Sequence, residues 1–475
     1  MTIPYLIGAF AISASLFFNR NKKMNYILVA IFLILQWVFT IFEYHHKNIE
    51  EYGYFLPDAI GVLLLFTISI IVVPAFYHSY VFFSKNDDHP RNRAMYYASM
   101  VVLIFALSLA YLSNHIAVTW IFVEMTTLSA SALIYHRRNL RTLEGTWKYI
   151  FVCSISITFV FIGILFLSIA VQQVGQSDLT FTSLIRRANE LDPFWLRLAF
   201  IFIFTGYTAK IGLVPMYTAG IDAKDKAPSP AGALLSSVLM NVGFIGIFRF
   251  YEIIAQTKLL PWTNNIIMIS AVLSIFIAAV YMIKVKNIKR MFAYSSIEHM
   301  GIVMLGIAAG GIGYYAAILH IILHSFVKSS LFFQMGQIYR IYKSKSIYDS
   351  GNYFKYNLTG AMVILLGFIS ATAMPPSGMF ISEFLIFRSL FEAHYLFVLI
   401  LVLLLLTIII WAFGKNIFKL LFSPAVDFDE TKVERIKPYE SISQFIFLGL
   451  VVYLGLNPPQ EMVDLINEAV KNLPL

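Results

Sequence analysis

Two ionisable residues of opposite charge stand inside apolar stretches of the sequence. Glu124 lies in WIFVEMTTLSA and Lys210 lies in TGYTAKIGLVP. A charged side chain at the centre of a bilayer costs roughly 2.5 to 3.5 kcal/mol, so such a residue is expected to have a partner or a function. Pairing favours the charged form of both residues, and separating them would favour proton release from the lysine. We therefore predict that Glu124 and Lys210 form a proton-exchanging pair. The alternative is a static ion pair that only fixes helix packing.

A second set of titratable residues lies in LHIILHSFVKSSLFF, where His320, His324 and Lys328 are spaced four residues apart. This spacing places the three side chains on one face of a helix. Three titratable groups in a row indicate a proton relay, and the alternative is that they join helices by hydrogen bonds. The His-x-x-x-His spacing also occurs at zinc sites, but no glutamate lies between the histidines and no cysteine is near. We therefore expect no metal site here.

Three further residues complete the candidate set. Glu383 in GMFISEFLIF follows a proline pair and is predicted to take part in proton transfer, with a lone glutamate at the membrane interface as the alternative. His299 in AYSSIEHMG is an accessory candidate. It opens an apolar stretch where Ser295 and Ser296 could equally cap a helix, which is the structural alternative. Asp222 is another accessory candidate, within a DAKDK stretch of mixed charge that is usually a solvated loop.

The composition indicates that lipid is the main solvent of this chain. Of 475 residues, 59% are hydrophobic and 13% are charged, and the mean hydropathy is +0.75. These values exclude a soluble globular domain. The single cysteine, Cys153, excludes iron–sulfur clusters, nickel–iron centres and structural zinc sites, which are usually held by several thiolates. We expect no redox centre, metal or cofactor in this chain, and we expect its net charge of +9 to lie in loops rather than on a nucleic-acid surface.

Apolar windows bounded by charged or turn residues predict an all-α polytopic membrane protein with about fourteen transmembrane helices. The predicted spans are 2–18, 24–42, 59–83, 94–112, 114–135, 147–172, 196–219, 229–254, 262–286, 290–310, 312–340, 360–388, 394–422 and 440–457. Loops after odd-numbered spans hold 25 of the 35 lysine and arginine residues. The positive-inside rule then places both termini on the outer, periplasmic side of the cell's inner membrane. The first eighteen residues are expected to be a span and not a signal peptide, because the basic cluster follows the apolar run.

Two predicted spans carry proline near mid-membrane: Pro215 in KIGLVPMYTAG, and Pro375 with Pro376 in TAMPPSGMF. Both helices should break there, and such breaks are tolerated where the freed carbonyls face protein or a water-filled cavity. The breaks fall at matching positions of two five-helix units, which predicts inverted repeats, although ordinary proline kinks are the alternative. The predicted organisation is residues 1–93 (helices 1–3), 94–258 (first repeat), 259–422 (second, inverted repeat) and 423–475 (last helix and short tail).

Six segments of the sequence resemble a known family. They run over residues 94–390 and comprise WIFVEMTTLSASALIYHRRNLRTLEGTWKY, DPFWLRLAFIFIFTGYTAKIGLVPMYT, DAKDKAPSPAGALLSS, KRMFAYSSIEHMGIVMLGI, LHIILHSFVKSSLFF and PPSGMFISEFLIF. The family comprises the proton-translocating, antiporter-like membrane subunits of respiratory complex I, membrane-bound group 4 hydrogenases and multisubunit cation/proton antiporters. Within it, the chain is most similar to the F-type membrane component of hydrogenase-4.

The resemblance implies roles for the candidate residues. Glu124 and Lys210 match a pair that gates protonation, and the three residues of LHIILHSFVKSSLFF match a hydrophilic axis along the membrane. Glu383 matches an acidic residue assigned to proton exit. In such subunits, electron transfer elsewhere in the complex drives proton pumping.

The chain also departs from the family. After the first break the family commonly reads PLHTWLPDAH, whereas this chain reads PMYTAGIDAK, so two histidines and a proline are replaced. Asn241 stands where complex I subunits tend to have a lysine, so a link between Lys210 and His324 would run through water. The short tail after residue 457 lacks the long lateral helix of the largest complex I antiporter subunit.

The predicted function is that of a non-catalytic, proton-translocating membrane subunit of a hydrogenase-like or complex I-like oxidoreductase. Its expected partners are other membrane subunits, a peripheral redox module and the lipid bilayer, with protons, or alternatively sodium ions, as the coupling ion. The alternative function is a sodium/proton antiporter module or the proton-conducting half of an inorganic-carbon uptake pair. A membrane anchor that no longer conducts protons is a third hypothesis. The cost of keeping Glu124, Lys210, Lys328 and Glu383 in lipid argues against it.

Overall fold

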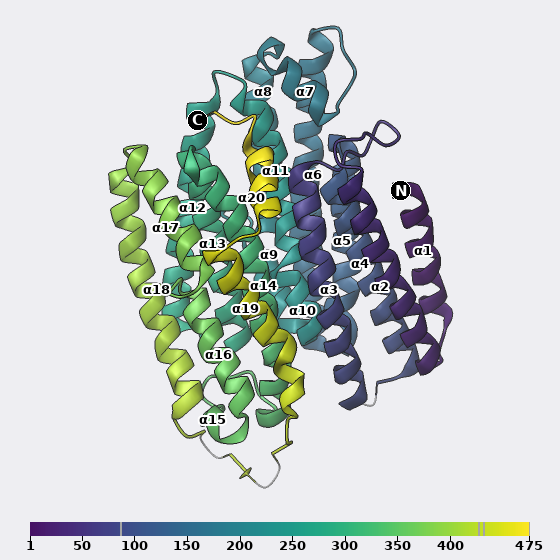
Figure 1. Ribbon diagram of the computed structural model, residues 1–475, viewed down its shortest axis with the longest axis vertical. Helices are drawn as coiled ribbons and strands as arrows, with labels where there is room; N and C mark the ends of the chain where they lie inside the picture. The colour runs from purple at the N-terminus through teal and green to yellow at the C-terminus, as the bar shows by residue number, and fades with distance from the viewer. Residues whose placement is uncertain (86–87, 426–427, 431–432, 475) are drawn as a thin grey trace. The chain divides into compact units, whose positions relative to one another are not determined.

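The long apolar stretches fold into helices, because lipid offers no water to the backbone and a helix satisfies its own hydrogen bonds. The computed structural model describes residues 1–85, 88–425, 428–430 and 433–474, which are almost entirely helical (Figure 1). Among these residues there are isolated β-bridges and no strand. The helices are α1 (Thr2–Phe18), α2 (Lys22–His45), α3 (Ala59–Lys85), α4 (Pro90–Leu112), α5 (Ile116–Ile134), α6 (Leu140–Gln173), α7 (Phe181–Arg187), α8 (Pro193–Ile211), α9 (Thr218–Lys226), α10 (Ser229–Ser236), α11 (Val238–Ala255), α12 (Leu260–Lys284), α13 (Ile288–Ala309), α14 (Ile312–Tyr342), α15 (Tyr353–Tyr356), α16 (Leu358–Ala371), α17 (Gly378–Glu392), α18 (Leu396–Phe422), α19 (Ile442–Leu456) and α20 (Gln460–Val470), with the 3-10 helices η1 (Tyr135–Arg137), η2 (Ala188–Glu190) and η4 (Pro438–Ser441).

The predicted all-α membrane architecture is confirmed, but the predicted count of fourteen spans is not. Within the described ranges, twelve helical segments are long and apolar enough to cross a membrane, and they correspond to twelve of the predicted spans. The predicted span 2–18 is α1, a helix of 17 residues. The predicted span 360–388 is divided into α16, of 14 residues, and α17, of 15 residues. A helix of 14 or 15 residues is shorter than the roughly 20 residues needed to cross the hydrocarbon core alone.

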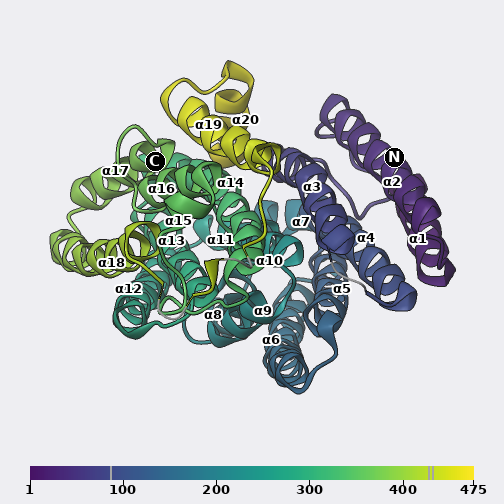
Figure 2. The ribbon, with the colours of Figure 1, turned by 90° about the horizontal axis from the view of Figure 1, so that it is seen from below.

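The chain divides into two compact units. The first consists of residues 1–227, 238–265 and 464–474, and the second consists of residues 228–237 and 266–463. In the first unit, α1 and α2 lie beside α3 and α4 (Figure 2), and α6 packs along α8. In the second unit, α14 contacts α10, α13, α16, α17 and α19 and is therefore its central helix. The predicted repeat boundaries at 94–258 and 259–422 stay a prediction.

A buried glutamine joins four helices of the first unit. Gln36 of α2 accepts a hydrogen bond from Tyr5 of α1, and it donates to Ser69 of α3 at 2.9 Å and to Ser108 of α4 at 3.2 Å. All four side chains are buried. Hydrogen bonds between apolar helices contribute roughly 0.6 to 2 kcal/mol each and have a defined geometry. They therefore fix the packing of helices whose other contacts are largely non-directional.

Glycines let α8 approach its two neighbours closely. A Cβ atom on Gly206 of α8 would lie 2.4 Å from the Ser156 carbonyl oxygen of α6. A Cβ atom on Gly243 of α11 would lie 2.4 Å from the Ile211 nitrogen at the end of α8. Small residues at such crossings allow backbones to pack against each other. The end of α8, which carries Lys210, is therefore held between α6 and α11.

Both predicted helix breaks are present. The first separates α8 from α9, and Gly212 ends α8 in the left-handed region with φ of 87° while its N–H donates to the Thr208 carbonyl at 2.8 Å. The second separates α16 from α17, and Ser377 caps α17 by accepting a hydrogen bond from the Met379 N–H at 3.2 Å. Proline lacks an N–H and cannot continue a helix, which explains the position of both breaks.

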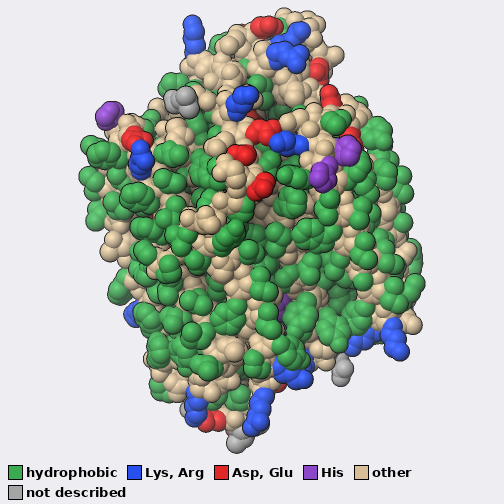
Figure 3. All heavy atoms as spheres, in the orientation of Figure 1, with side chains coloured by type: hydrophobic (Ala, Val, Ile, Leu, Met, Phe, Trp, Pro, Cys, Tyr) green, Lys and Arg blue, Asp and Glu red, His purple; other side chains and the backbone are tan. Residues whose placement is uncertain are grey.

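The surface of the helices is apolar along most of their length. On the face shown in Figure 3, hydrophobic side chains cover the middle of the helices, and lysine, arginine, aspartate and glutamate lie toward their ends. Phe397, Leu404, Trp411 and Phe418 follow one face of α18 at seven-residue intervals and are 79%, 61%, 57% and 47% exposed. Such an exposed apolar face is typical of a helix in contact with lipid or with another membrane subunit.

Gly206→Ala is expected to destabilise the first unit, because the added methyl group overlaps Ser156 and Val160 of α6. Overpacking of this kind costs roughly 1 to 3 kcal/mol. The matched control is Gly449→Ala in α19, where an added Cβ meets no atom within 4 Å and alanine is the better helix former. The midpoint of thermal unfolding in detergent is the measurement. If both variants unfolded at the wild-type midpoint, the close packing of α6 against α8 would be contradicted.

Candidate functional site

Lys210 lies in the last turn of α8, inside a cluster of hydroxyl groups. Its side chain is only 5% exposed. Its Nζ donates to Thr127 Oγ1 at 2.8 Å and to Thr126 Oγ1 at 3.3 Å on α5, and it lies 3.5 Å from the Tyr149 hydroxyl of α6. It also lies 5.6 Å from the centroid of the Tyr149 ring, within the range of a cation–π contact. The lysine is therefore solvated by side chains of the protein itself.

Glu124 is joined to Lys210 through a threonine. The Thr127 hydroxyl accepts from Lys210 and donates to Glu124 Oε2 at 3.1 Å. Among the described residues no direct ion pair joins the glutamate to the lysine, and Glu124 itself is half-buried. A hydroxyl can accept one hydrogen bond while donating another, so the three side chains form a continuous hydrogen-bonded chain. The structure thus brings the two predicted residues together by a route that their sequence positions do not reveal.

The segment after the first break is a helix, and the prediction that it is a solvated loop is wrong. Within α9, Lys224 is 4% exposed and Asp225 is 2% exposed. Lys224 Nζ donates to Met240 Sδ of α11 at 3.0 Å, and Lys226 forms an ion pair with Asp225 at 3.1 Å. Helix formation buries these charged residues against α6, α8 and α5. Lys224 is therefore a second buried lysine in the first unit that reasoning from the sequence missed.

The two other accessory candidates of the first unit lie near this lysine in sequence or structure. Asp222 is half-buried on α9, two residues before Lys224. Asn241 is fully buried on α11, adjacent in sequence to the Met240 that Lys224 contacts. A buried amide can donate and accept hydrogen bonds without titrating, so Asn241 can support a neighbouring charge but cannot carry a proton.

A chain of hydrogen bonds crosses the second unit and includes two histidines. His299 Nε2 of α13 donates to the Ala371 carbonyl of α16 at 3.1 Å, and His320 Nε2 of α14 lies 3.2 Å from His299 Nδ1. His320 Nδ1 lies 2.9 Å from Ser382 Oγ of α17. With both imidazoles neutral, the carbonyl fixes the direction of the chain: Ser382 donates to His320, which donates to His299.

The helix break supplies the acceptor at the end of this chain. In an unbroken helix the Ala371 carbonyl would accept from the N–H four residues later, but that residue is Pro375, which has no N–H. The freed carbonyl accepts from His299 instead. The second proline break is therefore part of the polar site and not only a kink.

Lys328 and two glutamates lie beside the histidines. Lys328 is fully buried on α14, and its Nζ donates to Ser295 Oγ of α13 at 2.7 Å. Glu298 is 3% exposed, and its Oε2 has no hydrogen-bond partner among the described residues, while Glu383 of α17 is 7% exposed. Glu298 lies within electrostatic range of both Lys328 and Glu383. Reasoning from the sequence did not include Glu298 in the site, although its position next to His299 was the available signal.

His299 lies inside α13, and His324 is buried next to it on α14. The alternative for His299 was a structural role beside helix-capping serines, but α13 begins at Ile288 with Asn287 as its cap, so that alternative is wrong. His324 is fully buried on α14, with its ring centroid 5.4 Å from that of His299. His320, His324 and Lys328 thus share one buried helix, and His299 faces two of them from α13.

A polar cavity of about 330 Å³ lies in the first unit around Arg249. Arg249 is 2% exposed, forms an ion pair with Asp58 at 3.0 Å, and donates to the carbonyl oxygens of Tyr111, at 2.7 Å, and Ser113. Glu252 of α11 also lines the cavity. These contacts tie α11 to the start of α3 and the end of α4.

In the part of the chain that the structure describes, no group of three or more His, Cys, Asp or Glu side chains is arranged to hold a metal ion.

Comparison with known proteins gives four consistent matches. Residues 113–409 match the family described as NADH:quinone oxidoreductase/Mrp antiporter, TM. The Hydrogenase-4 component F homolog of Methylacidiphilum infernorum (isolate V4) is 29% identical over 447 residues, which is 92% of this chain and 92% of that protein. NADH-quinone oxidoreductase subunit N 2 of Chloroherpeton thalassium is 25% identical over 490 residues, covering 98% and 94%. The fold is similar to a chain of the membrane-bound sulfane sulfur reductase, an archaeal respiratory membrane complex, with a TM-score of 0.86, 19% identity and coverage of 98% and 96%.

The helical fold and the buried titratable side chains define a polytopic, antiporter-like membrane subunit. The family match covers more than half of the chain. The chain therefore belongs to the NADH:quinone oxidoreductase/Mrp antiporter membrane family, and the resemblance inferred from the sequence is confirmed. It is a multi-pass integral membrane protein, and its relatives are subunits of multisubunit membrane complexes.

Arg249→Gln is expected to destabilise the first unit strongly. The change leaves Asp58 without its cation and removes donors from two carbonyl oxygens, and breaking a buried pair of this kind costs roughly 3 to 5 kcal/mol. Arg388→Gln is the control, because its ion pair with Glu392 is exposed and worth at most about 1 kcal/mol. The free energy of unfolding in mixed micelles measures both. Equal losses in the two variants would contradict a structural role for Arg249.

Proposed function

We propose that this chain translocates protons as a membrane subunit of a hydrogenase-like or complex I-like oxidoreductase. The observation that carries the proposal is the chain from Lys210 through Thr127 to Glu124, with hydrogen bonds of 2.8 and 3.1 Å inside an apolar helical unit. A buried lysine, a hydroxyl and a carboxylate in this order can hold a proton, pass it on and respond to a nearby charge. The family membership supports the same function.

In the first unit, a proton reaches Lys210 from the cytoplasmic side, and Glu124 sets the affinity of the lysine for it. The Thr127 hydroxyl relays this influence because it bonds to both side chains. Lys210 is the second residue before Gly212, where the chain leaves the helix, so a small movement at the break changes its contacts with α5. The break therefore serves as the moving part of the proton switch.

In the second unit, the proton moves along the face formed by His320, His324 and Lys328 and leaves past Glu383. An imidazole that accepts a proton at one ring nitrogen can release one from the other. His320 is placed for this because its two nitrogens face Ser382 and His299. Ser382 also bonds to the Met379 carbonyl at 3.0 Å, so its hydroxyl must rotate between two acceptors as protons pass.

The surroundings of the subunit belong to the same proposal. The distribution of basic residues supports a position in the cell's inner membrane with both termini on the outer side. Other membrane subunits and a peripheral redox module would supply the driving force, as the names of the relatives indicate for their own complexes. Lys224 is proposed as a further proton-carrying group, because it is buried and its ammonium group contacts a thioether, which is a weak acceptor.

A sodium/proton antiporter module is the second candidate function, because the matching family description includes the Mrp antiporter. The two candidates differ in their driving force. A redox-driven subunit takes up protons when the complex receives electrons, whereas an antiporter takes them up when a sodium gradient is applied.

Lys210→Met is expected to lower proton uptake by about tenfold or more, because loss of a proton-transfer group has effects of this order or larger. The assay follows a pH-sensitive dye in vesicles that contain the complete complex, driven first by electron donor and then by a sodium gradient. Lys258→Met makes the same substitution at an exposed position and should retain the wild-type rate. Wild-type uptake by Lys210→Met under both driving forces would refute the proposed function, and uptake under the sodium gradient alone would favour the antiporter.

Thr127→Val is expected to slow proton uptake while Thr127→Ser retains most of it. Valine has nearly the same volume as threonine but cannot relay a hydrogen bond from Lys210 to Glu124, whereas serine keeps the hydroxyl. The same vesicle assay measures both variants, and the thermal midpoint in detergent shows whether either is merely destabilised. If valine and serine gave the same rate, the hydroxyl would have no part in the transfer.

A further inference from the structure

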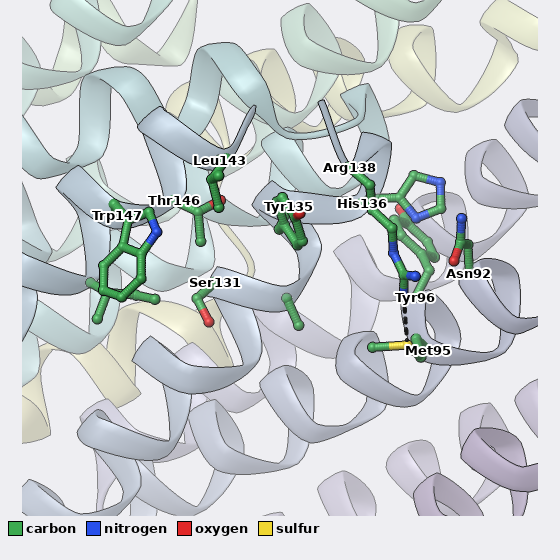
Figure 4. A pocket seen from close by; sticks show the side chains of 12 residues that line it. Asn92, Met95, Tyr96, Ser131, Tyr135, His136, Arg138, Leu143, Thr146 and Trp147 are labelled. Atoms are coloured by element: carbon green, nitrogen blue, oxygen red, sulfur yellow. Dashed lines mark hydrogen bonds between the residues drawn. The ribbon is translucent and has the colours of Figure 1, made fainter. Parts of the chain in front are cut away.

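A second cavity of the first unit, of about 310 Å³, lies apart from the proposed proton path (Figure 4). It is formed where α4 begins, where α5 ends in η1 and where α6 begins. Its polar lining includes Asn92, Tyr135, Arg138 and Trp147, while Met95, Leu143 and Ile150 contribute apolar surface. The cavity thus combines hydrogen-bond donors with an apolar wall.

The polar side chains of this cavity are hydrogen-bond donors suited to an anion. The Tyr135 hydroxyl, the Trp147 indole and the Asn92 amide make no side-chain hydrogen bond with other described residues, and the described residues of the lining include no aspartate or glutamate. Arg138 donates only to Met95 Sδ, at 3.1 Å, which is a weak acceptor (Figure 4). A guanidinium with most of its N–H groups unused is suited to a phosphate, which it can bind in a bidentate manner.

A buried histidine at the same cavity is also incompletely paired. His136 is 6% exposed, and its Nε2 makes no hydrogen bond with a described residue. Its contact with an acidic residue is with Asp88, whose Oδ2 lies 3.5 Å from Nε2. Arg138 has a φ of 49°, in the left-handed region that favours glycine. An arginine at a strained backbone position agrees with a use for its side chain.

The charge around the cavity is strongly positive. The described residues of 85–93 and 137–148 include seven lysine or arginine residues and two aspartate or glutamate residues. Basic groups at the membrane surface attract anionic lipid headgroups. The complementary ligand at this place is therefore a phosphate group and not a cation.

The apolar part of the cavity continues into a lipid-facing surface. Trp147, Phe151 and Ile155 follow one face of α6 at four-residue intervals and are 64%, 67% and 37% exposed. Trp147 and Tyr135 lie at the helix ends, where tryptophan and tyrosine gather at the boundary between hydrocarbon and water. A molecule with an anionic head and an apolar tail fits this arrangement, whereas free phosphate would leave the aromatic surface uncovered.

We propose that this cavity binds one anionic phospholipid, with its phosphate at Arg138 and Tyr135 and its acyl chain along Trp147 and Phe151. The donors supply the headgroup site, the absence of carboxylates from the lining favours a negative charge, and the exposed face of α6 receives the acyl chain. The bound lipid would hold together the ends of α4, α5 and α6. It would thereby support α5 and α6, the two helices that contact Lys210.

The test is retention of lipid by the complete complex after purification in mild detergent. Native mass spectrometry and phospholipid extraction count the phosphatidylglycerol or cardiolipin molecules that remain on this chain. Arg138→Gln is expected to reduce retention about fivefold, the effect of one basic residue near an anionic lipid surface. Arg141→Gln removes the same charge from an exposed position in the first turn of α6 that does not line the cavity, and it should retain the wild-type amount.

Three outcomes would overturn the proposal. The first is equal retention in Arg138→Gln and Arg141→Gln, which would indicate general attraction to the basic loops. The second is displacement of the lipid by millimolar inorganic phosphate as readily as by added phosphatidylglycerol, which would indicate a phosphate site. The third is a photo-crosslink from a probe at Leu143 to a neighbouring subunit instead of to lipid. A larger gain in thermal midpoint from phosphatidylglycerol than from phosphatidylcholine, lost in Arg138→Gln alone, would support the proposal independently of lipid counts.

Discussion

The structure depends on the cost of placing a charge in an apolar interior, because that cost determines which helices must touch. Lys210 is tolerated only where α5 brings two threonines and α6 brings Tyr149 within 3.5 Å of its ammonium. Those contacts require α8 to pack closely on α6, and this is achieved with glycine at position 206, where any side chain would overlap α6. A buried lysine thus requires a small residue one turn earlier on the same helix. Loss of this close approach would leave the lysine without its hydroxyl partners. The packing of α8 on α6 and the hydrogen bonding of Lys210 therefore depend on each other.

The same reasoning explains why prolines lie next to the titratable groups in both units. A regular helix uses all of its own carbonyl groups and offers none to a side chain. Pro375 lacks the N–H that would occupy the Ala371 carbonyl, and His299 takes its place. In the first unit, Pro215 stands four residues after Ile211 and likewise releases the carbonyl at the end of α8, next to Lys210. Broken helices thus add backbone dipoles to a site in which side chains alone would provide too few partners.

The sequence predicted those parts of the site that stand out against an apolar background. Glu124, Lys210 and Glu383 could be found because a charge in an apolar stretch is rare, and the residues of α14 could be found because their spacing has the period of a helix. Thr127 could not be found, since threonines are ordinary in membrane helices and only the approach of α8 gives this one a role. Lys224 was missed because hydropathy windows read a short, charged segment as loop, whereas burial of α9 depends on contacts with helices distant in sequence. The count of fourteen spans is not confirmed, because the proline pair that predicted the second break leaves two helices of 14 and 15 residues, each short for a full span.

A site that consists of hydroxyls, imidazoles, lysines and carboxylates is sensitive to the distances between its charged groups. Two unit charges about 6 Å apart interact by roughly 3 kcal/mol at an effective dielectric constant of about 20, which corresponds to a factor of about 100 in a protonation equilibrium. Hydrogen bonds of 2.8 and 3.1 Å through Thr127 place Lys210 and Glu124 within this range. Glu124 is half-buried on α5, so a change of charge beyond that helix acts on the glutamate first and on the lysine through it. In the proposed mechanism, the threonine between them converts an external electrostatic change into a change of proton affinity at the helix break, and this coupling is the property that a driven proton-translocating subunit requires.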